Sequence, residues 1–171
     1  QAISTRADLF GPEIADELAK LRDRLPAFPA EKARNTISKE LGRPVDQLFS
    51  SFEETPIAAA SIAQVHFATT LIGEKVAIKI LRPEIEKAFS RDLTLLRWTA
   101  RLVTSLRPAL KRLRLEEVVE TLAETARIEM DLRLEAAAAT ELYENFEGDP
   151  TYNVPKVFWK YTSQRVLATS Q

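Results

Sequence analysis

The sequence contains no cysteine and only one histidine, His66. Without cysteine the chain can form no disulfide bond, no thiol nucleophile and no thiolate metal site. A single histidine argues against a histidine-ligated zinc site, and we predict no metal site within the chain. No run of about 18 uninterrupted apolar residues is present, so we expect no segment that spans a bilayer.

An excess of charge of one sign is also missing, because the chain has 24 Lys and Arg residues and 25 Asp and Glu residues. Nucleic-acid-binding domains are usually strongly basic, so we expect no nucleic-acid partner. The hydrophobic fraction of 45% is too high for a disordered chain and supplies a core for 171 residues. The sequence starts at Gln1 with no charged-then-apolar leader, and we expect a piece of a longer protein.

Two periodicities divide the chain near residue 51. Before that point apolar residues recur at helical spacing, in one helix that begins at Gly11-Pro12 and a second between Pro29 and Gly42. A short helical turn is expected over 44–49. After that point β-branched and aromatic residues predict a hairpin of two strands, Ser61–Thr69 and Lys75–Leu81, joined by a turn.

Helical spacing returns after Pro83. An apolar stripe predicts one long helix that ends near Pro108, and a second, uninterrupted helix is expected over 116–145. Two short strands, Val154–Trp159 and Arg165–Ala168, are expected to follow. Helices, a hairpin, two long helices and short strands in this order predict an α+β fold.

The sharpest chemical signal is Val76-Ala77-Ile78-Lys79, a lysine near the end of an apolar strand. Protein kinases hold nucleotide phosphates with a lysine in this setting, because the strand fixes the backbone and the ammonium reaches the phosphates. The plainer alternative is a lysine that protects an edge strand from aggregation. The tetrapeptide alone does not decide between the two.

The segment that would cover the phosphates contains alanine where kinases have glycine. Kinases place Gly-x-Gly-x-x-Gly about fifteen to twenty residues before this lysine. No glycine falls in that window, which instead holds Ala58-Ala59-Ala60-Ser61. Alanine allows close approach but not the backbone conformations reserved for glycine, and an ordinary packed turn is the alternative interpretation.

These segments together resemble the UbiB/ADCK family of atypical protein-kinase-like proteins, which supports ubiquinone (coenzyme Q) biosynthesis, and most resemble its bacterial members. The similarity covers nearly the whole chain in the right order. It is carried by residues 58–66 and 76–79, Arg82-Pro83, Gln1 with Ser4-Thr5-Arg6-Ala7-Asp8-Leu9, Glu129-Met130-Asp131 with Glu135-Ala136, and Arg165-Val166-Leu167.

The resemblance implies a protein-kinase-like small lobe over 51–171 that ends at the hinge, preceded by a helical family-specific extension over 1–50. The large lobe is absent from the sequence. Gln1 would belong to the extension, which regulates access to the active site. ATP and Mg²⁺ would be the cofactors of the full-length parent, with ATPase or small-molecule-kinase activity. The residues implied in nucleotide binding are Lys79, Ala58, Ala59, Ala60, Ser61, Glu129 and Asp131.

Helical geometry leaves open which carboxylate pairs with Lys79. Glu129 and Asp131 are two residues apart, which is about 200° around a regular helix, so both cannot face one ligand unless the helix is distorted. Asp131 would share its face with Glu135, whereas Glu129 would share a face with Arg133. A solvated helix face is the alternative for each acid.

Nothing in the sequence matches the family's His-x-Asp…Asn or Asp-Phe-Gly segments, which supply the catalytic acid and the magnesium ligands. We therefore expect no catalytic residue in this chain and no phosphoryl transfer by it alone. The predicted function is the nucleotide-binding small lobe of an atypical kinase or ATPase that supports ubiquinone biosynthesis. The alternative is a non-catalytic lipid- or protein-binding scaffold. An ordinary protein kinase lobe is opposed by the missing glycine loop.

Residues 93–115 hold six cations and no acid, with Trp98, Leu102 and Leu106 among them. We expect part of this segment to rest on an anionic membrane surface, near the machinery for ubiquinone precursors. The alternative is that its arginines pair with the acids that follow. The resemblance implies a peripheral location at the cytoplasmic face of the bacterial inner membrane. A homodimer is a further expectation, and His66 is expected to be a hydrogen-bonded strand residue.

Overall fold

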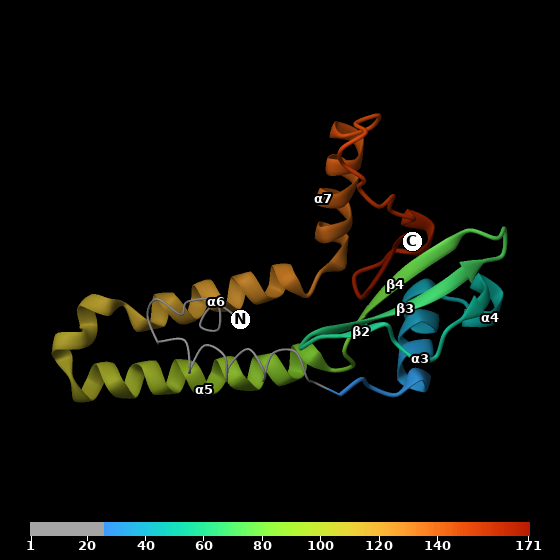
Figure 1. The fold of residues 1–171 in the computed structure, drawn as a ribbon. Helices are drawn as coiled ribbons and strands as arrows, with labels where there is room; N and C mark the ends of the chain where they lie inside the picture. The colour runs from blue at the N-terminus through green and yellow to red at the C-terminus, as the bar shows by residue number, and fades with distance from the viewer. Residues whose placement is uncertain (1–25) are drawn as a thin grey trace, which may run out of the picture.

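A computed structural model describes residues 26–171, so Gln1, the segment 4–9 and the helix predicted from Gly11-Pro12 lie outside the described residues (Figure 1). The described part combines a small antiparallel sheet, two helices packed on the sheet, a long helical hairpin and one further helix. This arrangement confirms the predicted α+β fold class.

The two helices before the sheet are α3 (Ala30–Leu41) and α4 (Val45–Leu48). Ala33 and Ile37 stand four residues apart, so they lie on one face of α3, and both are fully buried. Gly42 ends α3 with φ +70°, a left-handed conformation that glycine adopts without strain. Both helices occur where the sequence predicts them.

The sheet has the strand order β1-β3-β4-β5, and every pairing is antiparallel. The predicted hairpin is confirmed, with four residues, 71–74, between its strands. β1 and β2 are short and were not predicted; both pair with β3, at different points along its length. The strands are β1 (Phe49–Phe52), β2 (Ala58–Ala59), β3 (Ala63–Thr70), β4 (Lys75–Leu81) and β5 (Val166–Ser170).

Alternation along β4 gives the sheet two different faces. Val76, Ile78 and Ile80 are fully buried and belong to one core cluster with Ile37 of α3. The residues between them, among them Lys79, lie on the other face and are half-buried. The helices α3 and α4 therefore share a core with the sheet, while a domain boundary near residue 50 stays a prediction.

After β4 the chain leaves the sheet and forms a helical hairpin of α5 (Ile85–Leu106) and α6 (Leu115–Glu129). The short 3₁₀ helix η1 (Pro108–Leu113) joins them. Leu93 and Ala100 of α5 pack against Val119 and Ala123 of α6. Figure 1 shows the hairpin projecting far from the sheet. Across residues 26–171, no helix is long and apolar enough to cross a membrane.

The prediction of one uninterrupted helix over 116–145 is wrong, because α6 ends at Glu129 and α7 (Leu132–Asn145) begins after a break. Asp131 is in an extended conformation, and its carboxylate accepts a hydrogen bond from the backbone N–H of Arg133. The two helices also have different packing partners. The α6 apolar face packs on α5, whereas Leu132 and Ala136 pack on the sheet, so one straight helix cannot serve both.

The predicted strand Val154–Trp159 is also wrong. Only Val157 forms a β-bridge, to Thr169, and the 3₁₀ helix η2 (Trp159–Tyr161) follows. Pro155 has no N–H to donate to a strand ladder, which limits pairing along this segment. The strand predicted over Arg165–Ala168 is present as β5, at the end of the described chain.

Candidate functional site

Lys79 lies in the interior of the sheet, because β4 pairs with β3 on one side and with β5 on the other. A lysine that protects an exposed edge of the sheet would lie on one of the edge strands, β1, β2 or β5. The edge-strand alternative therefore does not apply. An interior strand holds the Lys79 backbone rigidly, as a group that positions a ligand requires.

The side chain of Lys79 forms an ion pair with Glu135 of α7. Its Nζ donates to Glu135 Oε2 at 2.7 Å and to Oε1 at 2.9 Å. Packing of Leu132 and Ala136 on Leu81 and Leu167 brings the first turns of α7 onto this face of the sheet. The carboxylate partner that helical geometry leaves open is thus Glu135, and the contact is similar to the lysine–glutamate pair of kinases.

The strand register aligns Lys79 with the alanine segment. Ala58, Val65, Lys79 and Leu167 are directly paired across β2, β3, β4 and β5. Directly paired residues of an antiparallel sheet point to the same face. Val65 and Ala77 are half-buried apolar residues of this face that sequence reasoning missed; the alternation along β3 and β4 was the available signal.

The alanine segment forms a tight turn between β2 and β3. The Ala60 N–H donates to the carbonyl of Ala63 at 2.8 Å and closes the turn around Ser61 and Ile62. Of the non-glycine residues that the structure describes, only Glu84 and Arg114 have positive φ, so the turn needs no glycine conformation. Within 26–171, the N–H groups of Ser61 and Ile62 donate to no acceptor. Adjacent free N–H groups suit an anion.

Glu129 and Asp131 lie at the break between α6 and α7, and no hydrogen bond or ion pair joins either carboxylate to Lys79. Glu129 is exposed. Asp131 pairs with Arg133 at 2.6 Å, and the hydrogen bond from Arg133 lowers the pKa of the Asp131 carboxyl. Asp131 also lines a groove of about 430 Å³ beside α5 and α6. A nucleotide role for these two acids stays a prediction.

His66 is fully buried on the sheet face opposite to Lys79. Its Nδ1 lies 2.7 Å from the carbonyl oxygen of Glu53, and its Nε2 lies 2.7 Å from Gln64 Nε2. A carbonyl can only accept, so Nδ1 carries the hydrogen and Nε2 accepts from the Gln64 amide. The ring is a neutral, hydrogen-bonded strand residue, as the sequence predicts.

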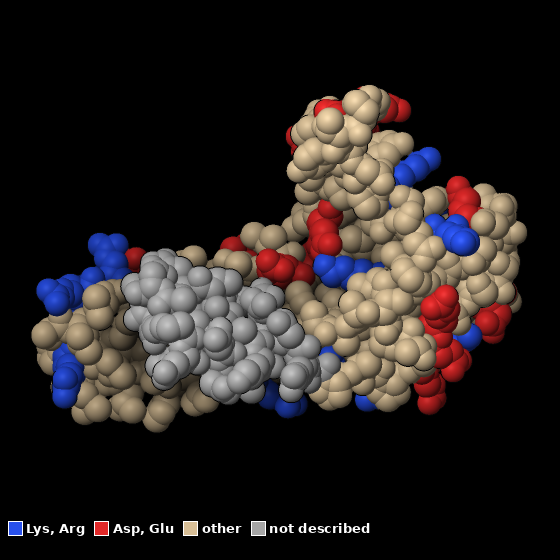
Figure 2. All heavy atoms as spheres, in the orientation of Figure 1, with Lys and Arg blue, Asp and Glu red and all other residues tan. Residues whose placement is uncertain are grey.

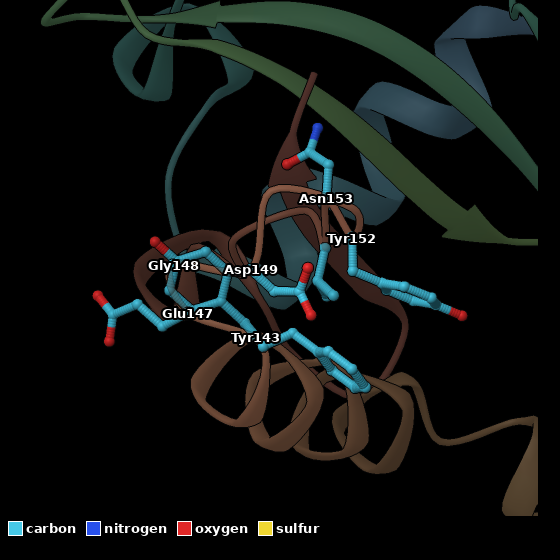
Figure 3. Close-up of a pocket in the computed structure, with 8 residues that line it drawn as sticks. Tyr143, Glu147, Gly148, Asp149, Tyr152 and Asn153 are labelled. Carbon is cyan, nitrogen blue, oxygen red and sulfur yellow. The ribbon is translucent and has the colours of Figure 1, made fainter.

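A second, shallow pocket of about 240 Å³ lies at the C-terminal end of α7, and Figure 3 shows Tyr143 there beside Tyr152 of the following loop. None of the residues predicted for the nucleotide lines it. The pocket is lined by Tyr143, Phe146, Glu147, Gly148, Asp149, Tyr152, Asn153 and Val154.

Over 26–171, no group of three His, Asp or Glu side chains is arranged to hold a metal ion.

The basic segment 93–115 is partly neutralised by α6. Arg97 pairs with Glu120 at 2.7 Å and Arg101 with Glu116 at 3.0 Å, as the ion-pairing alternative expects. A third pair joins Arg114 to a neighbouring glutamate. The remaining three cations, Arg107, Lys111 and Arg112, form no ion pair with any residue that the structure describes. Figure 2 shows basic side chains gathered at the far end of the hairpin.

Comparison with known proteins gives one consistent family. The ABC1 atypical kinase-like domain matches residues 20–170. A protein of Marinobacter nauticus named "Probable protein kinase UbiB" is 46% identical over 167 residues, which are 98% of this chain and 30% of that protein. The protein of the same name from Aeromonas salmonicida is 46% identical over 168 residues, 98% of this chain and 31% of its own length.

A solved structure supports the same fold. The complex of Rv3197 with erythromycin from Mycobacterium tuberculosis superposes with a TM-score of 0.72 at 31% sequence identity. The match covers 99% of this chain and 42% of that one. This chain therefore spans less than a third of the length of the curated relatives quoted above and less than half of this structural relative.

Proposed function

Because this chain belongs to the ABC1 atypical kinase-like family, we propose that it forms the nucleotide-binding small lobe of an atypical kinase or ATPase. The observation that carries the proposal is the ion pair between Lys79, on an interior strand, and Glu135 of α7. In kinases the equivalent pair holds the lysine where it meets the nucleotide phosphates.

Three features of Lys79, the alanine turn and the Lys79 face of the sheet fit ATP. The Lys79 ammonium supplies a positive charge for the α- and β-phosphates. The N–H groups of Ser61 and Ile62, which have no acceptor among residues 26–171, can donate to phosphate oxygens. Val65 and Ala77 offer small apolar surface on the same face, where a flat base could pack. Ala58 and Ala59 form the strand that leads into the turn.

Mg²⁺ would neutralise the phosphate charges in the full-length parent, with ligands from its large lobe. By itself the chain would bind nucleotide without transferring a phosphoryl group. The names of the curated relatives support a role of the parent in ubiquinone biosynthesis.

The test of this proposal is ATP binding by the full-length parent, measured with and without Mg²⁺ for the wild type and for Lys79→Ala. We expect the substitution to weaken ATP binding by at least about tenfold, because it removes the charge that meets the phosphates. Glu135→Gln is expected to weaken binding less, since the lysine keeps its charge.

The matched control is Lys39→Ala, which removes an exposed lysine of α3, the helix packed on the other face of the sheet. This variant is expected to bind ATP like the wild type. Equal ATP affinity of the wild type and Lys79→Ala would contradict the proposal, as would a wild type that does not bind ATP. Either result would favour the scaffold function.

A second proposal concerns the helical hairpin of α5 and α6, which we expect to rest on an anionic membrane surface. Three of its cations are without an acidic partner in the described chain, and Trp98 and Leu106 of α5 are 60% and 72% exposed. Cations and exposed apolar side chains together suit the interface of an anionic bilayer. A peripheral location at the bacterial inner membrane follows from this proposal. A homodimer stays a prediction.

A further inference from the structure

Arg82, the residue after β4, joins segments that are far apart in the sequence. Its Nε donates to the carbonyl of Ala60 at 3.0 Å, and its Nη2 donates to the carbonyl of Pro26 at 2.9 Å. Its backbone N–H donates to the carbonyl of Ile62 at 2.8 Å. Arg82 therefore holds the alanine turn at two of its carbonyls, and one guanidinium connects this turn to Pro26.

Gln64 makes a second link to the same part of the chain. Its Oε1 accepts from the backbone N–H of Phe28 at 3.0 Å, and its Nε2 donates to the carbonyl of Phe28 at 3.3 Å. The amide of Gln64 is 1% exposed, so these bonds are protected from water. The Arg82 guanidinium also lies 5.7 Å from the centre of the Phe28 ring. The leading segment, Pro26–Phe28, is thus fixed by two side chains.

From these contacts we propose that Arg82 is a positioning residue for the nucleotide. It would hold the turn around Ser61 and Ile62 in the shape that leaves their N–H groups free, and tie that shape to the leading segment. The proposal rests on the nucleotide-binding function argued above. Arg82 itself would act through the turn.

The requirement for arginine follows from its geometry. Nε and Nη2 are fixed in one plane and donate in two directions, one to Ala60 and one to Pro26. A lysine at this position has one nitrogen on a flexible stem and cannot hold both carbonyls in the same way.

The shared guanidinium makes the two segments interdependent. Displacement of the leading segment would remove one acceptor of Arg82 and loosen its hold on Ala60. By linkage, nucleotide that favours the ordered turn must favour the docked leading segment by the same factor. The docking of Pro26–Phe28 would therefore control nucleotide affinity at the turn.

The experiment measures ATP affinity of the full-length parent for the wild type, Arg82→Lys and Arg82→Gln, together with hydrogen exchange of the backbone amides. We expect ATP affinity to fall by about tenfold or more in Arg82→Gln and by less in Arg82→Lys. In the wild type, ATP is expected to slow exchange at the Phe28 amide. This protection is expected to disappear in Arg82→Gln.

The matched control is Arg43→Gln, which removes an exposed arginine between α3 and α4 and is expected to bind ATP like the wild type. Wild-type affinity in Arg82→Gln, with affinity lost in Lys79→Ala, would overturn this inference and leave the proposed function intact. Affinity unchanged in Lys79→Ala would overturn the proposed function itself. If Arg82→Gln does not fold, Arg82→Lys decides: wild-type affinity and wild-type protection at Phe28 would overturn the inference.

Discussion

At the scale of single residues, the ion pair between Lys79 and Glu135 contributes little to the stability of the fold. The side chain of Lys79 is 31% exposed and that of Glu135 is 49% exposed. Ion pairs this accessible to water contribute about 0–1 kcal/mol to stability. Substitution of Lys79 should therefore leave the free energy of unfolding nearly unchanged.

His66 is buried, and its neighbours hold its imidazole in the neutral form. Burial lowers the pKa of its imidazole from the usual 6.5, and the hydrogen bond to the Glu53 carbonyl only partly opposes this. Protonation would place an Nε2–H against the N–H group of Gln64, which also holds Phe28. Acid should thus weaken the contact between the leading segment and the sheet.

The resulting prediction concerns stability against pH. The unfolded chain takes up a proton at His66 near pH 6.5, whereas the folded chain resists it, so full stability is present above that pH and declines below it. His66→Gln should be less stable than the wild type at about pH 7.5 but should lose less stability on acidification. Thermal unfolding of the parent measures this, and parallel curves for both proteins would contradict it.

At the scale of elements, the break between α6 and α7 determines where Glu135 lies. Asp131 caps α7 through the Arg133 N–H, and Leu132 N–H donates to the carbonyl of Gln164. This second bond ties the start of α7 to the segment before β5. These two hydrogen bonds therefore fix the geometry of the break, and in this geometry α7 packs on the sheet.

Two substitutions at Asp131 separate a capping role from a nucleotide role. Asparagine caps a helix about as well as aspartate, whereas alanine costs about 1 kcal/mol. Asp131→Ala should lower the free energy of unfolding by about that amount, and Asp131→Asn by less. Urea unfolding of the parent measures both.

ATP affinity in Asp131→Asn then tests the predicted nucleotide role. Weakened binding in a variant of near wild-type stability would support a direct role of the carboxylate charge. Wild-type binding would restrict Asp131 to capping. Equal stability of Asp131→Ala and the wild type would contradict the capping role.

Elements whose own residues show an apolar pattern of helical or alternating spacing could be predicted from the sequence. Elements and contacts that depend on residues far away in the sequence could not. The alternation of Val76, Ile78 and Ile80 gives β4 its bounds, and Lys79 follows from the same pattern. β1 could not be predicted, because its polar centre, Ser50-Ser51, lacks an apolar pattern. The Glu135 partnership depends on packing between residues 56 positions apart, which local spacing cannot reveal.

At the scale of the whole molecule, the hairpin gives the lobe a long arm whose tip is basic. Its α5 face away from α6 exposes Leu95, Trp98 and Leu106. This chain spans 30% of the length of its Marinobacter relative, and a protein of that length has further surfaces that could contact the arm. Membrane binding by the tip is therefore tested on the full-length parent.

Vesicle binding tests the membrane proposal through the three cations without acidic partners. Replacement of Arg107, Lys111 and Arg112 by glutamine should weaken binding of the parent to vesicles rich in anionic lipid, and added salt should weaken wild-type binding. Flotation with the vesicles measures this. Arg97→Gln is the control, because Glu120 already pairs with Arg97. Equal flotation of the triple variant would contradict the proposal.

The insertion of the hairpin between β4 and α7 also bears on how the lobe assembles. Lys79 and Glu135 are 56 residues apart, but the start of α5 and the end of α6 meet at one groove, lined by Phe89 and Met130. Once the hairpin has formed from its own neighbouring helices, the chain between the two residues is effectively about fivefold shorter. The entropy cost of closing that loop then falls by about 1.4 kcal/mol. The helical hairpin is thus expected to fold first, before Lys79 and Glu135, which it separates in the sequence, come together.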